Sequence, residues 1–177
     1  MADIERISTS SPYEPIAGYS RLVRAGDYIF VSGTTAFDER GLLVGAGQMY
    51  VQARQCLTNI EAALKRVGAT MANVVRTRMF VTDISRFNDA ARAHGEFFAA
   101  TRPATSMVEV KALVSPPMLI EIEADVYLPQ ARVVSSAAST AAATPAKARR
   151  TPKAPAAPKA KARSAAKKPA AKTRKRR

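Results

Sequence analysis

Residues 102–128 read RPATSMVEVKALVSPPMLIEIEADVYL and form two runs rich in β-forming residues, joined by a Pro-Pro turn. In the second run, which starts at Ile120, apolar residues alternate with Glu121, Glu123 and Asp125. This period of two predicts a strand with one apolar face and one acidic face. The acidic face has two interpretations. It is simply solvated, or one carboxylate points into a cleft and handles a proton or a water molecule.

Charge divides the chain into two unequal parts. The chain has 177 residues and 28 Lys or Arg, of which 15 follow Gln130, where no Asp or Glu occurs. The first 130 residues therefore hold 13 basic and 14 acidic residues, a net charge of −1. We predict a folded domain over residues 1–129. Residues 130–177 form a predicted disordered basic tail, because Ala, Lys and Pro offer little apolar surface to bury.

The sequence also bounds the compartment. The single Cys56 rules out an intramolecular disulfide, which suits a reducing environment. No apolar run approaches the ~20 residues of a membrane span, and the N-terminus lacks the apolar segment of a signal peptide. We therefore expect a soluble, cytoplasmic protein.

Hydrophobic periodicity predicts the secondary structure. The expected elements are an extended arm over 1–18, strands over 19–23 and 28–35, a loop over 37–47, a helix over 48–67, a strand over 74–82, a second helix capped by Asp83 or Ser85 and running to about residue 100, and the two strands of 102–128. The strand over 28–35 is apolar on both faces, which indicates cover on both sides. The order β-β-α-β-α-β-β predicts an α+β two-layer domain, in which a mixed sheet packs on two helices.

The same patterns assign residues to faces. On the strand over 74–82, Val75 and Thr77 share one face, while Arg76 and Arg78 share the other. The apolar stripe of the helix over 48–67 comprises Met49, Ala53, Cys56, Leu57, Ile60, Ala63, Leu64 and Val67. The apolar stripe of the second helix comprises Phe87, Ala90, Ala91, His94, Phe97 and Phe98.

Three motifs together resemble the RidA family, also called YjgF or L-PSP proteins. RPATSMVEV followed by IEIEADVYLP is similar to its C-terminal signature, and GDYIFVSGTTA and QARQCLTNIEAALKRVGA agree in order and spacing, over residues 13–128. The resemblance implies a chorismate-mutase-like fold and a homotrimer with clefts between subunits. It also implies hydrolysis of reactive enamines and imines to a keto product and ammonium, without a cofactor.

The resemblance further implies a set of site residues. Glu121 matches the Glu that positions or activates the attacking water, and Tyr19 matches a Tyr whose hydroxyl contacts the substrate. The backbone of Ser32 and Gly33 matches the part that lines the pocket. Met107 stands where the family commonly has Cys.

Position 105 departs from the family pattern. RidA proteins read RPAR-S, in which the second Arg binds the substrate carboxylate, whereas this chain has Thr105. A Thr hydroxyl cannot reproduce the bidentate grip of a guanidinium on a carboxylate. Arg102 lies at an odd offset in an extended segment and is expected to point away from the side of Thr105. We therefore expect a substrate altered relative to 2-imino acids.

Other candidate residues have two interpretations each. His94, the only histidine, is either a partly buried residue with one hydrogen bond or a lining residue of the altered pocket. It has no His or Cys partner at ligand spacing, so no metal site is expected. Cys56 is interpreted as a packing residue. Arg76 and Arg78 lie on a solvated strand face or bind anions near the pocket or trimer axis.

The tail is similar to the Ala-Lys-Pro tails of histone H1-like and some bacterial nucleoid proteins. Its cations favour salt-dependent, sequence-independent binding of DNA or RNA. A trimer would present three tails, which would raise the avidity for nucleic acid steeply. A solubilising appendage is the alternative. The candidate contacts are Lys147, Arg149, Arg150, Lys167, Lys168, Lys172, Arg174, Lys175, Arg176 and Arg177.

Two hypotheses for function therefore stand side by side. The first is an imine or enamine deaminase acting on a small molecule. The second is a metabolite-binding or trimerising module whose tail binds nucleic acid and places it at the nucleoid. A ribonuclease is disfavoured, because one histidine provides no pair for acid-base catalysis.

Overall fold

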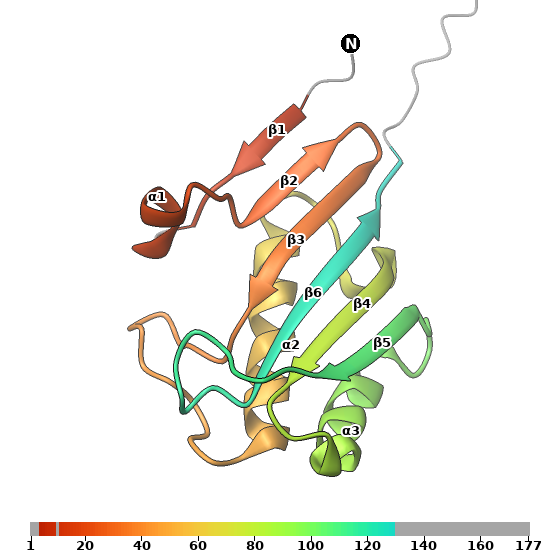
Figure 1. Ribbon diagram of the computed structural model, residues 1–177. Helices are drawn as coiled ribbons and strands as arrows, with labels where there is room; N and C mark the ends of the chain where they lie inside the picture. Colours follow the sequence, from red (N-terminus) through yellow and green to blue (C-terminus); the bar gives the residue numbers. More distant parts are fainter. Residues whose placement is uncertain (1–3, 10, 130–177) are drawn as a thin grey trace, which may run out of the picture. The chain divides into compact units, whose positions relative to one another are not determined.

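The computed structural model describes residues 4–9 and 11–129 (Figure 1). The tail and its predicted contacts therefore lie outside the described residues. The strands are β1 (Ile4–Ile7), β2 (Leu22–Ala25), β3 (Tyr28–Thr34), β4 (Val74–Val81), β5 (Ala104–Glu109) and β6 (Ile120–Tyr127). The helices are α1 (Tyr13–Ala17), α2 (Met49–Lys65) and α3 (Phe87–Phe98), with 3-10 turns η1 (Met71–Asn73) and η2 (Ile84–Arg86).

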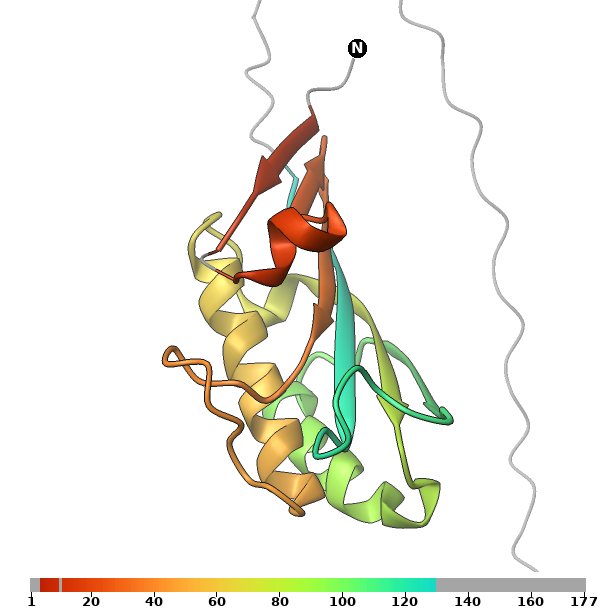
Figure 2. The ribbon, with the colours of Figure 1, turned by 60° about the vertical axis from the view of Figure 1, so that its left-hand side comes forward.

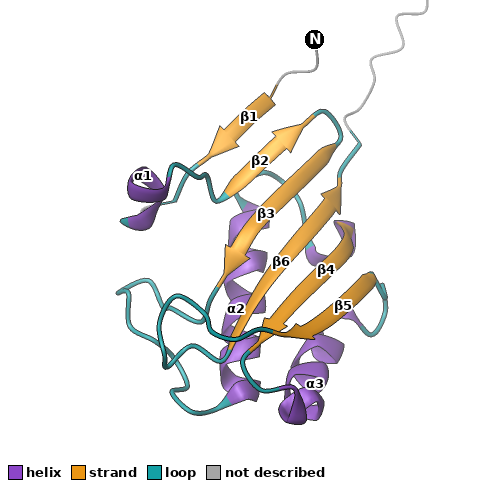
Figure 3. Ribbon diagram, in the orientation of Figure 1, coloured by secondary structure: helices purple, strands orange, loops and turns teal. Residues whose placement is uncertain are grey.

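The strands form one mixed sheet in the order β1-β2-β3-β6-β4-β5. Every neighbouring pair is antiparallel except β4 and β5, which run parallel. Helices α2 and α3 cover the same face of the sheet, as Figures 2 and 3 show from two directions. The predicted α+β class, with a mixed sheet packed on two helices, is confirmed.

The core lies between β6 and α2. Ile120, Ile122, Ala124 and Val126 are fully buried on the helix-covered face, as the alternation along β6 predicts. Helix α2 presents its predicted stripe, including Cys56, to this layer. Burial raises the pKa of the Cys56 thiol, and Glu121 adds to this effect, so the packing role of Cys56 is confirmed.

One buried polar residue on α2 was not predicted. Gln52 is fully buried, and its amide nitrogen donates to the carbonyls of Pro117 at 2.8 Å and Gly45 at 3.2 Å. Its amide oxygen accepts from the backbone nitrogen of Leu119 at 2.8 Å. The helix is thereby joined to the loop that precedes it and to the turn before β6, which is distant in sequence.

The N-terminal prediction was wrong in three places. The segment expected as an extended arm contains β1, which pairs with β2 from Ile4 opposite Ala25, and the short helix α1. Both are too short to give a clear period. The first predicted strand starts later, at Leu22, because the residues after Gly18 lead out of α1. Within the single chain, the helices cover one face of strand β3, and Tyr28 and Phe30 on its other face are 50% and 46% exposed.

Three further predictions were wrong, one at β4 and two at α3. A register shift between Val74 and Arg76 places Val74 in the core and leaves Val75 44% exposed. Asp83 caps η2, not the helix, by accepting from the backbone nitrogen of Ser85. Helix α3 buries Ala90, Ala93 and Phe98, whereas Phe87 at its start is half exposed, so the predicted stripe was rotated near its N-terminus.

No helix in the described part of the chain is long and apolar enough to cross a membrane.

Candidate active site

The uncovered face of the sheet carries alternating charges. Arg78 donates to both carboxylate oxygens of Asp125, at 3.2 and 3.0 Å, and to Glu123 at 3.5 Å. Arg76 forms a longer ion pair with Asp125, at 3.7 Å. The arginines of β4 therefore neutralise two of the three acids of β6. This disfavours a free anion-binding role for Arg76 and Arg78.

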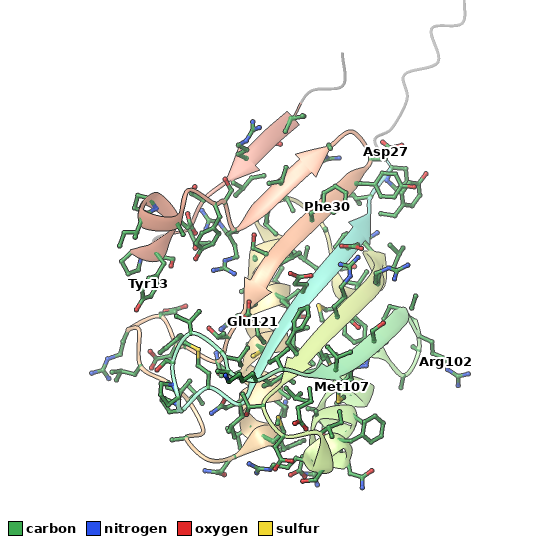
Figure 4. All side chains as sticks on the ribbon, in the orientation of Figure 1. Tyr13, Asp27, Phe30, Arg102, Met107 and Glu121 are labelled. Atoms are coloured by element: carbon green, nitrogen blue, oxygen red, sulfur yellow. The ribbon has the colours of Figure 1, made fainter. Side chains whose placement is uncertain are left out.

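Glu121 differs from the other two acids of β6. Its carboxylate packs against Gly33, and a Cβ atom added at Gly33 would overlap its Oε1 (Figure 4). Burial raises the pKa of Glu121, the negative charge of Glu123 raises it further, and Arg21 opposes both effects. A carboxylate with a raised pKa in a partly desolvated position is suited to exchange protons with a water molecule.

A bulge in β3 makes room for this carboxylate. Val31 pairs with Ala124 and Thr34 pairs with Ile122, so Ser32 and Gly33 together oppose a single residue of β6. Ser32 Oγ donates to the carbonyl of Ser20 at 2.7 Å, which ties the bulge to the chain before β2. The absence of a side chain at Gly33 then lets the Glu121 carboxylate lie against the backbone.

Tyr19 reaches the same region from the end of α1. Its backbone nitrogen donates to the carbonyl of Glu14 at 3.2 Å, and its hydroxyl lies 3.4 Å from Ser11 Oγ and from Arg21 Nη2. Glu14 itself is buried and accepts from Thr9 through backbone and side chain. Burial raises the pKa of Glu14, but these hydrogen bonds outweigh it and the net shift is downward.

Thr105 lies on the other face of the sheet. It pairs in register with Thr77, which is fully buried, and the two hydroxyl oxygens are 2.9 Å apart. The Thr77 hydroxyl is also 2.9 Å from Nε2 of His94. Met107 lies two residues further along β5, on the same face, and packs against the core. His94 thus has the hydrogen bond that its first interpretation required, and burial lowers its pKa.

The predicted site residues therefore fall into two groups within one chain. Glu121, Tyr19, Ser32 and Gly33 gather on the uncovered face, whereas Thr105, Met107 and His94 lie at the β5 edge on the helix-covered side. Arg102 joins neither group. It precedes β5 and has a φ of 49°. Its Nε donates to the carbonyl of Ala99 at 3.3 Å, and its side chain points away from the sheet (Figure 4). The predicted orientation is therefore right, but the cause is the turn before β5 and not the alternation of a strand.

Sequence reasoning missed two residues of these groups. Arg21 was not selected because the RidA motif draws attention to position 105, although it lies two residues from Tyr19. Thr77 was assigned only to the same strand face as Val75, although a hydroxyl among apolar residues of one face signals a buried hydrogen bond. Two open depressions lie on the surface. One, of about 420 Å³, is lined by Tyr19 and residues of α1. The other, of about 230 Å³, is lined by Tyr50 and further residues of α2.

The fold and the bulge-lined carboxylate define a class: α+β domains of the chorismate-mutase-like type. The family model described as Endoribonuclease L-PSP matches residues 9–128. The chain belongs to this family, whose members also carry the names YjgF and RutC.

Named relatives agree with this assignment. A RutC family protein of Synechocystis is 35% identical over 125 residues, which cover 70% of this chain and 95% of that protein. A solved structure of a YjgF/YER057c/UK114 family member from Mycobacterium tuberculosis is 44% identical, with a TM-score of 0.64, and covers 71% of this chain and all of that one. A Rid family structure from Yersinia pestis is 30% identical with a TM-score of 0.65, over 71% and 100% of the two chains.

Proposed function

We propose that this protein hydrolyses a small reactive imine or enamine to a keto compound and ammonium, with Glu121 as the proton-transferring group. The observation that carries the proposal is the Glu121 carboxylate, which lies against Gly33 whereas its two neighbours pair with arginines of β4. Burial and the charge of Glu123 raise the pKa of Glu121. Membership of a family that includes Rid proteins supports the reaction class. The chemistry itself requires no cofactor, because an imine carbon is already electrophilic.

Each step balances with these groups. Glu121 accepts a proton from water as the water oxygen bonds to the imine carbon, and the proton is then delivered to nitrogen. The carbinol oxygen then loses its proton to Glu121 as the carbon–nitrogen bond breaks, and Glu121 passes that proton to the departing nitrogen, which leaves a carbonyl and ammonia. Ammonia takes one further proton from water to become ammonium. Tyr19, on the same wall, is placed to donate a hydrogen bond to the substrate or intermediate.

The test is a matched pair of variants. Imines are generated in the assay from amino acids by an amino-acid oxidase, and keto product and ammonium are measured. Glu121→Gln is expected to lower turnover by roughly 10²–10⁴-fold, because an amide cannot accept the proton. Glu123→Gln, the neighbouring acid on the same face, should retain most of the activity. Equal losses in the two variants, or none in Glu121→Gln, contradict the role of Glu121.

We further propose that Thr105 redirects substrate choice. Without a cation at this position, 2-iminobutyrate should be hydrolysed poorly relative to an Arg-bearing relative. Thr105→Arg is expected to raise its turnover, with Thr77→Val as a control for disturbance of the hydroxyl pair. Wild-type turnover equal to that of an Arg-bearing relative would show that position 105 does not limit the reaction.

The proposed active form is a homotrimer. The two groups of site residues lie on opposite faces of one sheet, so a cleft containing both needs a neighbouring chain. Exposed apolar residues on the uncovered face, namely Tyr28, Phe30, Val108 and Tyr127, favour such a neighbour. Light scattering is expected to give three subunits, and a monomer would remove the cleft from the proposal.

A second function is proposed for residues 130–177: sequence-independent binding of nucleic acid, with a place at the nucleoid. The 15 cations without an acid motivate it. Filter binding of the full chain to DNA and RNA at two salt concentrations, compared with a chain ending at Gln130, should show loss of affinity on truncation and on raising salt. Equal affinity of the two chains contradicts it, and supports a solubilising tail.

A further inference from the structure

Arg21 lies on the same wall as Glu121. It immediately precedes β2, on the uncovered side of the buried Leu22, and its backbone carbonyl accepts from the Ser32 amide in the β3 bulge. Its guanidinium spans the bulge, with Nη1 donating to the carbonyl of Gly33 at 2.9 Å and to Thr34 Oγ1 at 3.1 Å. The Glu121 carboxylate packs against the Cα atom of the same Gly33. The guanidinium is therefore fixed beside the proposed proton-transferring group.

The hydrogen bonds of Arg21 leave one edge of the guanidinium available. Both protons of Nη1 are accounted for by the contacts with Gly33 and Thr34, and Nη2 makes one long contact, 3.4 Å, to the Tyr19 hydroxyl. Among the described residues, no hydrogen bond involves Nε. The N–H groups of Nε and Nη2 on that edge point in the same direction, which is the fork that binds a carboxylate with two parallel hydrogen bonds.

The charge of Arg21 is also not matched at close range. Within the described part of the chain no carboxylate lies within 4.0 Å of its guanidinium, unlike Arg76 and Arg78, which pair with Asp125. Its field nevertheless reaches Glu121 and Glu14, and lowers the pKa of each. A half-buried cation held by backbone carbonyls and hydroxyls, without a close counter-charge, is suited to receive an anion from outside.

We propose that Arg21 binds the acid group of the substrate, on the wall formed by Tyr19 and Gly33, and so replaces a cation at position 105. This inference rests on the proposed function and deepens it, since it assigns the substrate to the anionic imines or enamines. The acid group then lies on the same wall as Glu121 and away from Thr105. The substrate is thus turned around relative to one held by an arginine at position 105. We therefore expect the protein to prefer different acidic imines or enamines, and not to lose the ability to bind them.

The experiment measures binding and not turnover. Calorimetry on the full chain uses 2-oxobutyrate, the keto-acid product of 2-iminobutyrate, and butanone as its uncharged counterpart. Arg21→Gln should weaken 2-oxobutyrate binding by roughly 10–100-fold, the size expected for a lost charge-assisted pair. Butanone binding should change little. Arg21→Lys should be several-fold weaker than wild type, because an ammonium lacks the two-pronged edge.

Arg24→Gln is the matched control. Arg24 lies three residues further along, is also half-buried, and also donates to backbone carbonyls, those of Gly26 and Leu128, far from the bulge. The Arg24→Gln variant changes the net charge by the same amount as Arg21→Gln. It therefore controls for non-specific electrostatic attraction between 2-oxobutyrate and the basic tail. Circular dichroism melting identifies a variant that fails to fold, in which case the Lys variant decides.

The outcomes separate this inference from the proposed hydrolysis. Wild-type binding of 2-oxobutyrate that is lost in Arg21→Gln and kept in Arg24→Gln supports it, even where no imine is turned over. Absence of wild-type binding, unchanged affinity in Arg21→Gln or Arg21→Lys, or an equal loss in Arg24→Gln overturns it, even where Glu121 proves essential to hydrolysis.

Discussion

The two faces of the sheet use the same strand for different purposes. On the side of α2, the even-numbered residues of β6 are fully buried and apolar, and they close the core. On the uncovered side, Glu121, Glu123 and Asp125 face arginines and a glycine bulge, and Tyr127 lies beside the exposed ring of Tyr28. Because successive side chains of a strand point to opposite faces, the even-numbered residues of β6 can stabilise the core while the acids between them serve the chemistry of the other face.

The difference also appears within the uncovered face. Glu123 and Asp125 have arginine partners from β4, whereas Glu121 faces the bulge and has only the longer-range influence of Arg21. The two partnered acids hold the face together, whereas burial and the charge of Glu123 raise the pKa of Glu121. Charge pairing, not acidity of residue type, distinguishes the candidate proton carrier from its neighbours.

The largest expected difference compares adjacent residues on opposite faces. Ile122→Ala should lower the free energy of unfolding by about 2–5 kcal/mol, because it leaves a cavity in the core. Glu123→Ala, one residue away, should cost about 1 kcal/mol or less, since its ion pair is partly exposed. Urea unfolding at one protein concentration measures both. Similar losses would mean that both faces are equally covered.

A smaller effect is expected for Arg78→Ala. The side chain is 39% exposed in the single chain, so loss of its ion pairs should cost about 0.2–1 kcal/mol and the loss should shrink as salt screens the charges. If neighbouring chains cover this face, Asp125 is desolvated and keeps only its longer ion pair with Arg76, so the cost rises towards about 3–5 kcal/mol. Unfolding at low and high salt therefore reports whether the face is buried in the assembly.

The smallest effect concerns the pH dependence of turnover. Glu121 must be ionised to accept a proton, so the rate should fall as pH drops through its pKa, which burial and Glu123 raise and Arg21 lowers. Glu123→Gln removes a nearby negative charge and should move this acidic limb to lower pH. The limb is measured as kcat/KM against pH. A shift to higher pH, or none, would contradict the assignment of that limb to Glu121.

The sequence was sufficient where one period dominates. The alternation along β6 and the apolar stripe of α2 each contain enough residues to establish a period. The buried face of β6 and the buried face of α2 were therefore assigned correctly. The short N-terminal elements were missed because β1 spans four residues and α1 five, which is too few to establish a period. The register shift near Val75 was missed because nothing in the strand pattern marks an extra residue.

The candidate site was less predictable than the fold. Family motifs led to Glu121, Tyr19 and Gly33, but only three-dimensional pairing shows that Thr105 shares a face with Thr77 and His94 and not with Glu121. Arg21 lies two residues from Tyr19 in sequence, but its position beside Glu121 depends on the two-residue bulge in β3, which the sequence pattern does not mark. Interactions between residues about 100 positions apart are set by register, which composition does not reveal.

The amide of Gln52 has a consequence for how the chain finds its register. Two of its three hydrogen bonds, those with Pro117 and Leu119, form only when the turn before β6 has reached α2, whereas Gly45 lies in the loop directly before the helix. Until then a polar group sits unpaired in an apolar layer, at a cost of about 1–3 kcal/mol. A slip of β6 by one residue would separate these partners and, in the same step, turn Glu121 towards the helices. Gln52 thus rejects misaligned strands during folding, and in doing so selects the face on which the acid emerges.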